Sequence, residues 1–327
     1  MRHNRRRFTS ASTLFLALSA AGLGPAAASD FPAKSIRLVV SYPPGGVADL
    51  LARTVAQSAS QALGQTVVVE NRPGGNQIIA TSAVARSDPD GYTLLLADDV
   101  VLTLNPHLFK KLSYAVSDIV PVIDLAESRI VLSTNGSSGK TLKEVVQYAK
   151  NHPGKLNYGT LGMGNTHHLL LEAIKQETKV DIVNVPYQGY AAAINDLLAG
   201  QVQLVSGGVG SPALGHIQSG KLQALAVSGN TRSALIPNTP TFSEAGYPNI
   251  QPSVSFIVYA PAGTPTALIQ QLHSGFAKAL KQANVVSTLA ENGLEPLGRL
   301  PDQVSASLAE KATSAAVTIE RIGLRLD

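Results

Sequence analysis

Short apolar runs that alternate with helix-like segments constrain the fold of this chain more than any other feature. The segments between the runs have helical spacing, and two longer amphipathic segments, residues 265–281 and 302–321, close the chain. A strand-helix-strand rhythm of this kind predicts an α/β fold of mostly parallel sheets with helices on both faces. The strand-like runs include residues 36–40, 66–69, 92–96, 130–132, 156–158, 182–185, 202–205 and 222–227.

The N-terminus has the pattern of a secretory signal. Four arginines lie within the first seven residues, residues 14–23 are apolar, and Ala26 and Ala28 satisfy the small-residue cleavage rule. We therefore expect residues 1–28 to be removed on export to the periplasm. The Arg5-Arg6-Arg7-Phe8 run leaves both the Sec and the twin-arginine routes open. The apolar stretch is too short for a membrane span, and because the chain has no Cys a lipid anchor is excluded.

Charge and composition exclude several classes of partner. The chain has 26 basic and 22 acidic residues, and the excess positive charge equals the four arginines of the expected signal. A neutral mature surface gives no electrostatic case for nucleic acid or anionic lipid. The absence of Cys also excludes disulfides, a thiol nucleophile and thiolate metal ligands.

Residues 36–53, I-R-L-V-V-S-Y-P-P-G-G-V-A-D-L-L-A-R, carry the first functional signal. A buried strand ends in a Pro-Pro-Gly-Gly turn, and a helix opens near Asp49. The first N–H groups of a helix have no intrahelical acceptor, so such a helix start can bind an anion or a dipole. A plain connection between strand and helix is the other interpretation of this segment taken alone.

Further motifs follow this turn in a fixed order. Together they resemble the Bug family, the periplasmic solute-binding proteins of tripartite tricarboxylate transporters, from about residue 31 to the C-terminus. The motifs are V-V-V-E-N-R-P-G-G at 67–75, D-P-D-G-Y-T-L-L-L at 88–96, N-P-H-L-F at 105–109, P-G-K-L-N-Y at 153–158, V-P-Y-Q-G at 185–189, D-L-L-A-G-Q-V at 196–202, G-K-L-Q-A-L-A-V at 220–227 and A-P-A-G-T-P at 260–265.

The resemblance implies a two-lobed fold like that of type II periplasmic binding proteins. Residues 29–129 and 253–327 would form lobe 1, and residues 130–252 would form lobe 2. Two chain crossings would then join the lobes and act as hinges around a cleft. We expect a monomer without stable membrane insertion.

The same resemblance places ligand-binding residues on both sides of the cleft. Backbone N–H groups and loop hydroxyls would hold the solute, and His167 would be structural or cleft-lining. Asn165 or Thr166 could equally serve only as the cap of the next helix. The expected ligand-binding residues are Tyr42, Pro44, Gly45, Gly46, Val47, Asp98, Asp99, Gly162, Met163, Gly164, Asn165, Thr166, His167, Tyr187, Gly189, Tyr190 and Ala191.

Catalytic, metal and cofactor motifs are missing from the sequence. Residues 136–141, G-S-S-G-K-T, come closest to a phosphate-binding loop, but Thr134 stands where its first Gly would be. The adjacent His167 and His168 point about 100° apart on a helix, and the other histidines lack metal-ligand spacing. No G-x-S-x-G elbow is present. We expect no cofactor, no metal and no enzymatic activity.

Two departures from the family bear on the ligand. Residues 97–101 read A-D-D-V-V where most members have a Ser/Thr/Gly-rich loop, and Gln203 stands where an acidic residue is usual. Residues 206–211 also form a longer glycine-rich loop. Carboxylates of Asp98 and Asp99 facing the cleft would favour a cationic, zwitterionic or neutral solute. Alternatively, one of them caps the next helix and the other faces solvent.

The sequence therefore predicts a periplasmic protein that captures a small organic solute and delivers it to a tripartite tricarboxylate-type membrane transporter. The solute could be of the carboxylate type, zwitterionic or neutral. The first alternative is a sensor that presents the solute to a two-component kinase. The second is an enzyme on the same scaffold, which the missing nucleophile and metal spacing oppose.

Overall fold

The computed structural model describes residues 31–187 and 189–326. The chain divides into two units, Met1–Phe31 and Pro32–Asp327, and the helices and strands of the described residues lie in the second. The expected signal segment, residues 1–28, lies outside the described residues.

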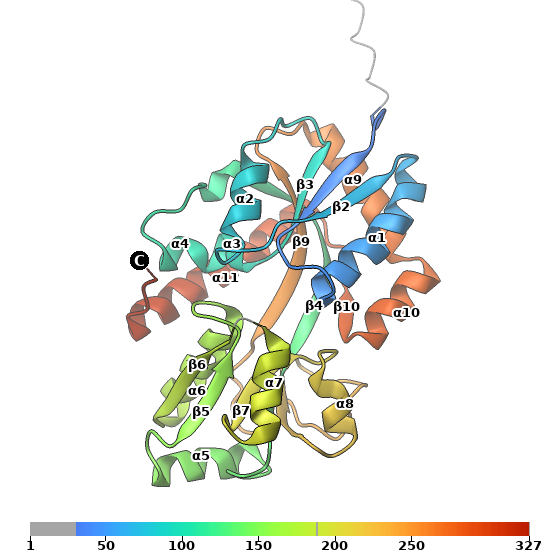
Figure 1. Cartoon of the computed structure of the whole chain (residues 1–327). Helices are drawn as coiled ribbons and strands as arrows, with labels where there is room; N and C mark the ends of the chain where they lie inside the picture. The colour runs from blue at the N-terminus through green and yellow to red at the C-terminus, as the bar shows by residue number, and fades with distance from the viewer. Residues whose placement is uncertain (1–30, 188, 327) are drawn as a thin grey trace, which may run out of the picture. The chain divides into compact units, whose positions relative to one another are not determined.

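The first group of strands forms one half of the second unit (Figure 1). Its order is β2-β1-β3-β9-β4, with β10 beside β4. β1 pairs in parallel with β2 and β3, whereas β9 and β10 run antiparallel to their neighbours. The strands are β1 (Ile36–Val40), β2 (Val67–Asn71), β3 (Thr93–Asp98), the first part of β4 (Ile119–Thr134), β9 (Ser253–Pro261) and β10 (Leu294–Pro296).

Helices flank this group. Buried Val39, Leu95 and Tyr259 from the strands pack in one cluster with Val304 and Leu308 of α11. The helices are α1 (Val47–Leu63), α2 (Ile78–Ala85), α3 (Val100–Thr103), α4 (Asn105–Leu108), the 3-10 helix η1 (Val116–Asp118), α9 (Thr266–Leu280), α10 (Ala283–Glu291) and α11 (Pro301–Ile322).

The second group of strands contains the other end of β4. Its order is β4-β7-β5-β6, with β8 also paired to β4. Apolar residues of α7, among them Ile194 and Leu197, pack against Val205 of β7. The elements are α5 (Leu142–Asn151), β5 (Leu156–Thr160), α6 (Thr166–Thr178), β6 (Ile182–Pro186), α7 (Tyr190–Ala199), β7 (Leu204–Gly208), α8 (Ala213–Gln218) and β8 (Gln223–Val227).

β4 joins the two groups, with β9 beside its first part (Figure 1). β4 pairs with β9 as far as Arg129, opposite Ser253, and from Ile130 onward it pairs with β7, opposite Gly208. The expected α/β class is confirmed, but the sheet is mixed rather than mostly parallel, because β4 and β9 run antiparallel to each other and to their other neighbours.

One local expectation was wrong. Ser206, Gly207 and Gly208, expected in a loop, are the last residues of β7. Their glycines allow close packing, because a Cβ on Gly207 would lie 2.2 Å from the ring of Tyr190 and one on Gly208 would lie 2.7 Å from Ser128 Oγ. The glycines therefore reflect close packing of the strand end rather than a flexible loop.

Candidate functional site

The turn after β1 ends in a helix start that no side chain caps. Gly46 is the N-cap residue of α1 and has extended backbone angles, φ −89° and ψ 176°. Asp49 fixes the turn from inside the first helical turn: its carboxylate accepts the N–H of Gly45 (3.0 Å) and hydrogen bonds from Asn71 (2.9 Å) and Arg53 (3.0 Å). The hydrogen bond from Arg53 is the main reason why the pKa of Asp49 falls to about 2.

Asp98 lies at the carboxyl end of β3 and supports Tyr42. The Tyr42 hydroxyl donates to Asp98 Oδ2, and Asp98 Oδ1 accepts the N–H of Val100 (3.1 Å), at the start of α3. Only 4% of Asp98 is exposed. Burial, and next the charge of Asp99, raise the pKa of Asp98 to about 7. This carboxyl group therefore changes charge near neutral pH.

Asp99 forms an ion pair with the last long helix. Its Oδ2 accepts a hydrogen bond from Lys311 Nζ of α11 at 2.5 Å, and the same ammonium lies 2.8 Å from Ser255 Oγ and 3.3 Å from Ser253 Oγ. Asp99 is also 4% exposed. Burial raises its pKa, and Lys311 opposes that shift. Asp99 holds the N-cap position of α3 without a side-chain cap, the Asp98 carboxylate accepts the first helical N–H, and Asp99 is buried rather than solvent-facing.

The glycine-rich loop after β5 is fixed where it enters α6. Asn165 is the N-cap residue of α6 and accepts the N–H of His168 (3.0 Å), which identifies the cap among the two residues proposed. Gly164 has a positive φ of 74°, and a Cβ there would lie 2.6 Å from Leu326 and 2.7 Å from Leu108. Only glycine allows this close approach to Leu108 of α4 and to Leu326, which follows α11.

His167 is neutral at physiological pH. Its Nδ1 lies 2.9 Å from Ser206 Oγ, which also accepts the hydroxyl of Tyr158 at 2.6 Å. Burial lowers the pKa of His167 to about 4. This side chain therefore contributes a dipole, not a cation, to its surroundings.

A second uncapped helix start follows β6. Gly189 is the N-cap of α7 and, like Gly46, offers no side-chain acceptor. The hydroxyl of Tyr187 donates to Asp196 (2.7 Å) of α7, while the ring of Tyr190 covers Gly207. The starts of α1 and α7 both lie at the level where the two groups of strands meet (Figure 1).

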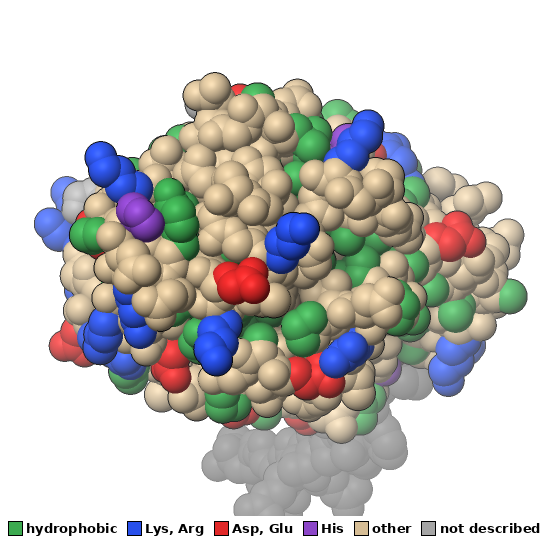
Figure 2. Space-filling model, turned by 90° about the horizontal axis from the view of Figure 1, so that it is seen from below, with side chains coloured by type: hydrophobic (Ala, Val, Ile, Leu, Met, Phe, Trp, Pro, Cys, Tyr) green, Lys and Arg blue, Asp and Glu red, His purple; other side chains and the backbone are tan. Residues whose placement is uncertain are grey.

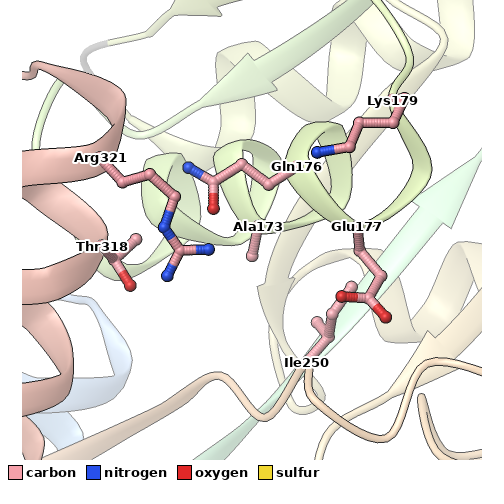
Figure 3. A pocket seen from close by; sticks show the side chains of 7 residues that line it. All are labelled: Ala173, Gln176, Glu177, Lys179, Ile250, Thr318 and Arg321. Carbon is pink, nitrogen blue, oxygen red and sulfur yellow. The ribbon is translucent and has the colours of Figure 1, made fainter.

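A pocket of about 510 Å³ lies between α3, α6 and α11, beside residues 250–253 at the start of β9. Of the expected residues it contains Asp99 and Thr166, together with Lys311 and Ser253. A smaller pocket of about 190 Å³ adjoins it through Ala173, Ile250 and Thr318. There Arg321 of α11 and Gln176 of α6 point toward the same space (Figure 3).

The structure thus joins Tyr42 and Asp98 in one hydrogen-bonded network, pairs Asp99 with Lys311, and links His167 to Ser206 of β7. Sequence reasoning missed two members of these networks. Lys311 is 212 residues away from Asp99, and no local motif marks it. Gln77 contacts both Tyr42 and Asp98. Its position directly after the P-G-G-N run is the one sequence feature that could have indicated a role in the site.

The described residues provide neither a metal site nor a membrane span. Within residues 31–187 and 189–326 no cluster of three His, Asp or Glu side chains is placed to hold a metal ion. None of the helices in the described part of the chain could span a bilayer. Figure 2 shows one face, seen from below, on which Lys and Arg alternate with Asp and Glu. That face therefore offers a polyanion no extended basic surface.

The two groups of strands share β4, and polar loops and uncapped helix starts lie where the groups meet. This arrangement is typical of the class of periplasmic solute-binding proteins. The model of the tripartite tricarboxylate transporter family receptor matches residues 51–324, and this chain belongs to that family. It is a family of periplasmic solute receptors rather than enzymes.

Individual relatives agree with this assignment. The protein BugT of Bordetella pertussis is 35% identical over 327 residues, which cover 99% of both chains. A solved structure of R. palustris Rpa4515 with adipate is 31% identical with a TM-score of 0.83, over 91% of this chain and 100% of that one. MatC of Rhodopseudomonas palustris with bound malate is 28% identical with a TM-score of 0.78, over 88% of this chain and 100% of that one.

Proposed function

We propose that this receptor captures a small neutral or amine-bearing solute and delivers it to a tripartite tricarboxylate-type transporter. The solute would lie between residues 42–47 and 97–101 on one side and residues 159–166 and 187–191 on the other. The change of partner along β4 supports lobe boundaries at 129/130 and 252/253. The protein would act as a monomer that closes on its solute by bending at these crossings.

The proposed class of solute rests on the charges of the side chains around the candidate site. The four segments contain no Lys or Arg, and His167 is neutral because its pKa is about 4. Asp98 and Asp99, in the second of these segments, are buried, and among the described residues Lys311 is the cation that forms an ion pair with Asp99. A dicarboxylate would therefore meet backbone N–H groups at the two helix starts but no unpaired positive side chain, whereas an amide or ammonium would also meet the negative charge that Asp98 carries when ionised. Relatives that bind adipate or malate share less than a third of their residues with this chain.

A series of four-carbon solutes tests this proposal. Succinate, succinamate, succinamide and 4-aminobutanamide differ in charge but hardly in length. In calorimetric titrations of the mature protein we expect succinamide or 4-aminobutanamide to bind about ten- to a hundredfold more tightly than succinate, as expected for one charge-assisted hydrogen bond. Mass spectrometry of solute that copurifies would identify the natural ligand.

A double variant provides the control for the series. Asp98→Ser with Asp99→Ser removes both carboxylates and frees Lys311, so preference should shift toward succinate. Tight wild-type binding of succinate that the double variant leaves unchanged would contradict the proposed solute class.

Export is a separate prediction. Periplasmic material should begin after about Ala28, because Ala26 and Ala28 fit the cleavage rule. N-terminal sequencing that finds Met1 on periplasmic protein would rule out a cleaved signal. An Arg5→Lys, Arg6→Lys, Arg7→Lys variant separates the routes, because twin-arginine export should fail and Sec export should continue.

A further inference from the structure

The N-R-P-G-G motif, residues 71–75, leads into a strained turn that the proposed function does not yet explain. Four consecutive residues have positive φ: Gly74 at 122°, Gly75 at 56°, Asn76 at 51° and Gln77 at 69°. Glycine adopts such angles freely, but the left-handed region is unfavourable for a glutamine. A strained residue of this kind persists only where its surroundings hold it, and such residues concentrate at functional sites.

Local structure does not account for a glutamine at this position. Gln77 is the N-cap of α2, but an N-cap residue normally has extended backbone angles and a short polar side chain that accepts from the first turn. Gln77 has φ 69° and ψ 3°, and its side chain makes no capping hydrogen bond. The Gln77 side chain makes its hydrogen bonds with residues outside α2.

That side chain connects the ends of β1 and β3. Its Oε1 accepts the hydroxyl of Ser41 at 2.8 Å and the N–H of Asp98 at 3.2 Å, and its Nε2 donates to the Tyr42 hydroxyl at 3.2 Å. The opposite amide orientation would place two donors, Nε2 and the N–H of Asp98, against each other. The network therefore fixes how the amide points.

Tyr42 is the member of this network that begins the proposed binding segment after β1. Its hydroxyl receives a hydrogen bond from Gln77 and donates one to Asp98, while its ring packs edge-on against Phe256 with centroids 6.1 Å apart. With both polar contacts in place, the hydroxyl is turned inward and the half-buried ring borders the Pro-Pro-Gly-Gly turn. Loss of Gln77 would leave Asp98 as the one side-chain partner of that hydroxyl.

We infer that Gln77 is a positioning residue, held in a strained backbone conformation so that its amide fixes Tyr42 and the carboxyl end of β3 for solute recognition. The inference rests on the proposed function for the identity of the site, but not on the solute class. Asn76 is a matched control, because it also has positive φ and its side chain lies near Asn105 Oδ1 (3.4 Å) instead of the Tyr42 network.

Ring-labelled [13C]tyrosine NMR of the mature, solute-free protein gives a direct test. Tyr42→Phe identifies the Tyr42 signals among those of the nine tyrosines. Gln77→Gly, which relieves the backbone strain and removes the amide, should shift or broaden the Tyr42 signals, whereas Asn76→Gly should leave them in place. Gln77→Leu keeps the strain, so it should change the Tyr42 signals and also lower the melting temperature. Unchanged Tyr42 signals in folded Gln77→Gly would overturn the inference.

Solute binding adds a second readout. Gln77→Gly should reduce the affinity ratio of succinamide to succinate at least about fivefold, and Asn76→Gly should not change it. If wild type shows no such preference, the proposed solute class fails while the NMR test still decides the role of Gln77. A Tyr42 signal that shifts equally in both glycine variants would show that the turn as a whole, not the Gln77 amide, positions Tyr42, and would overturn the inference.

Discussion

Replacing Gly46 with valine is expected to weaken solute binding by at least about a hundredfold while leaving the fold almost intact. The backbone of Gly46 is extended, at φ −89°, and no atom lies within 4 Å of the Cβ that valine would add. The solute-free protein should therefore melt within about 3 °C of wild type. The branched side chain would instead fill the space in front of the first N–H groups of α1, where the solute is proposed to bind.

Gly45 is the matched control for this variant. It has a positive φ of 86°, and a Cβ there would also meet nothing within 4 Å. Gly45→Ala should therefore lower the melting temperature through backbone strain, whereas Gly46→Ala should not. Of the two glycines in the Pro-Pro-Gly-Gly turn, Gly45 has the positive φ and Gly46 does not. Equal losses of stability and binding in Gly46→Val would show that the turn is only structural.

The sequence allowed prediction of those elements whose formation depends on residues close together in the chain. The apolar run of residues 36–40 coincides with β1, and Asn165 caps α6 as one of the two residues proposed for that role. Burial of alternate apolar residues and one short polar cap are visible within a few residues of sequence. Such features do not depend on how distant segments meet.

The parts that depend on distant partners were not visible. The first half of β4 and all of β9 were not recognised as strands, although they form the connection between the two groups. Their pairing joins residues more than 120 positions apart, such as Arg129 with Ser253. Lys311 was not predicted for the same reason, because its role depends on an ion pair with Asp99, a residue far away in the sequence. Whether Asp98 and Asp99 turn inward depends on these contacts, so the residue pattern left that question open.

The second large effect is expected in the pH dependence of stability. In the folded protein, burial and the charge of Asp99 raise the pKa of Asp98 to about 7, whereas an unfolded aspartate has a pKa of about 3.9. The folded state therefore binds this proton more tightly. The stability that the protonated carboxyl contributes is fully present below about pH 4 and is lost as the pH rises through about 7.

Asp98→Asn should remove this pH dependence. The amide stays neutral, its oxygen can accept the N–H of Val100, and its NH₂ group can donate to the Tyr42 hydroxyl. At about 1.4 kcal/mol for each pKa unit, the variant should exceed wild type in unfolding free energy by roughly 2–4 kcal/mol at pH 8 and by much less at pH 4.5. Urea unfolding at several pH values between these limits measures the difference.

Asp49→Asn is the control of opposite sign. The pKa of Asp49 is lowered to about 2, mainly by its hydrogen bond from Arg53. The stability contributed by that ionised carboxylate is present above about pH 4 and is lost as the pH falls through about 2. Asp49→Asn should therefore destabilise the protein at pH 7. A constant difference between Asp98→Asn and wild type from pH 4.5 to 8 would mean that Asp98 is already ionised throughout this range.

The same titration should appear in solute preference. Because Asp98 gains negative charge between about pH 6 and 8, wild-type affinity for 4-aminobutanamide relative to succinate should rise over that interval. Asp98→Asn should show a lower and nearly flat ratio, because its charge no longer changes. If the ratio rises equally in both proteins, another group controls it, and Asp98 then acts only as the partner that holds Tyr42. A rise confined to wild type would tie the buried carboxyl, through Tyr42, to the charge of the solute that this receptor selects.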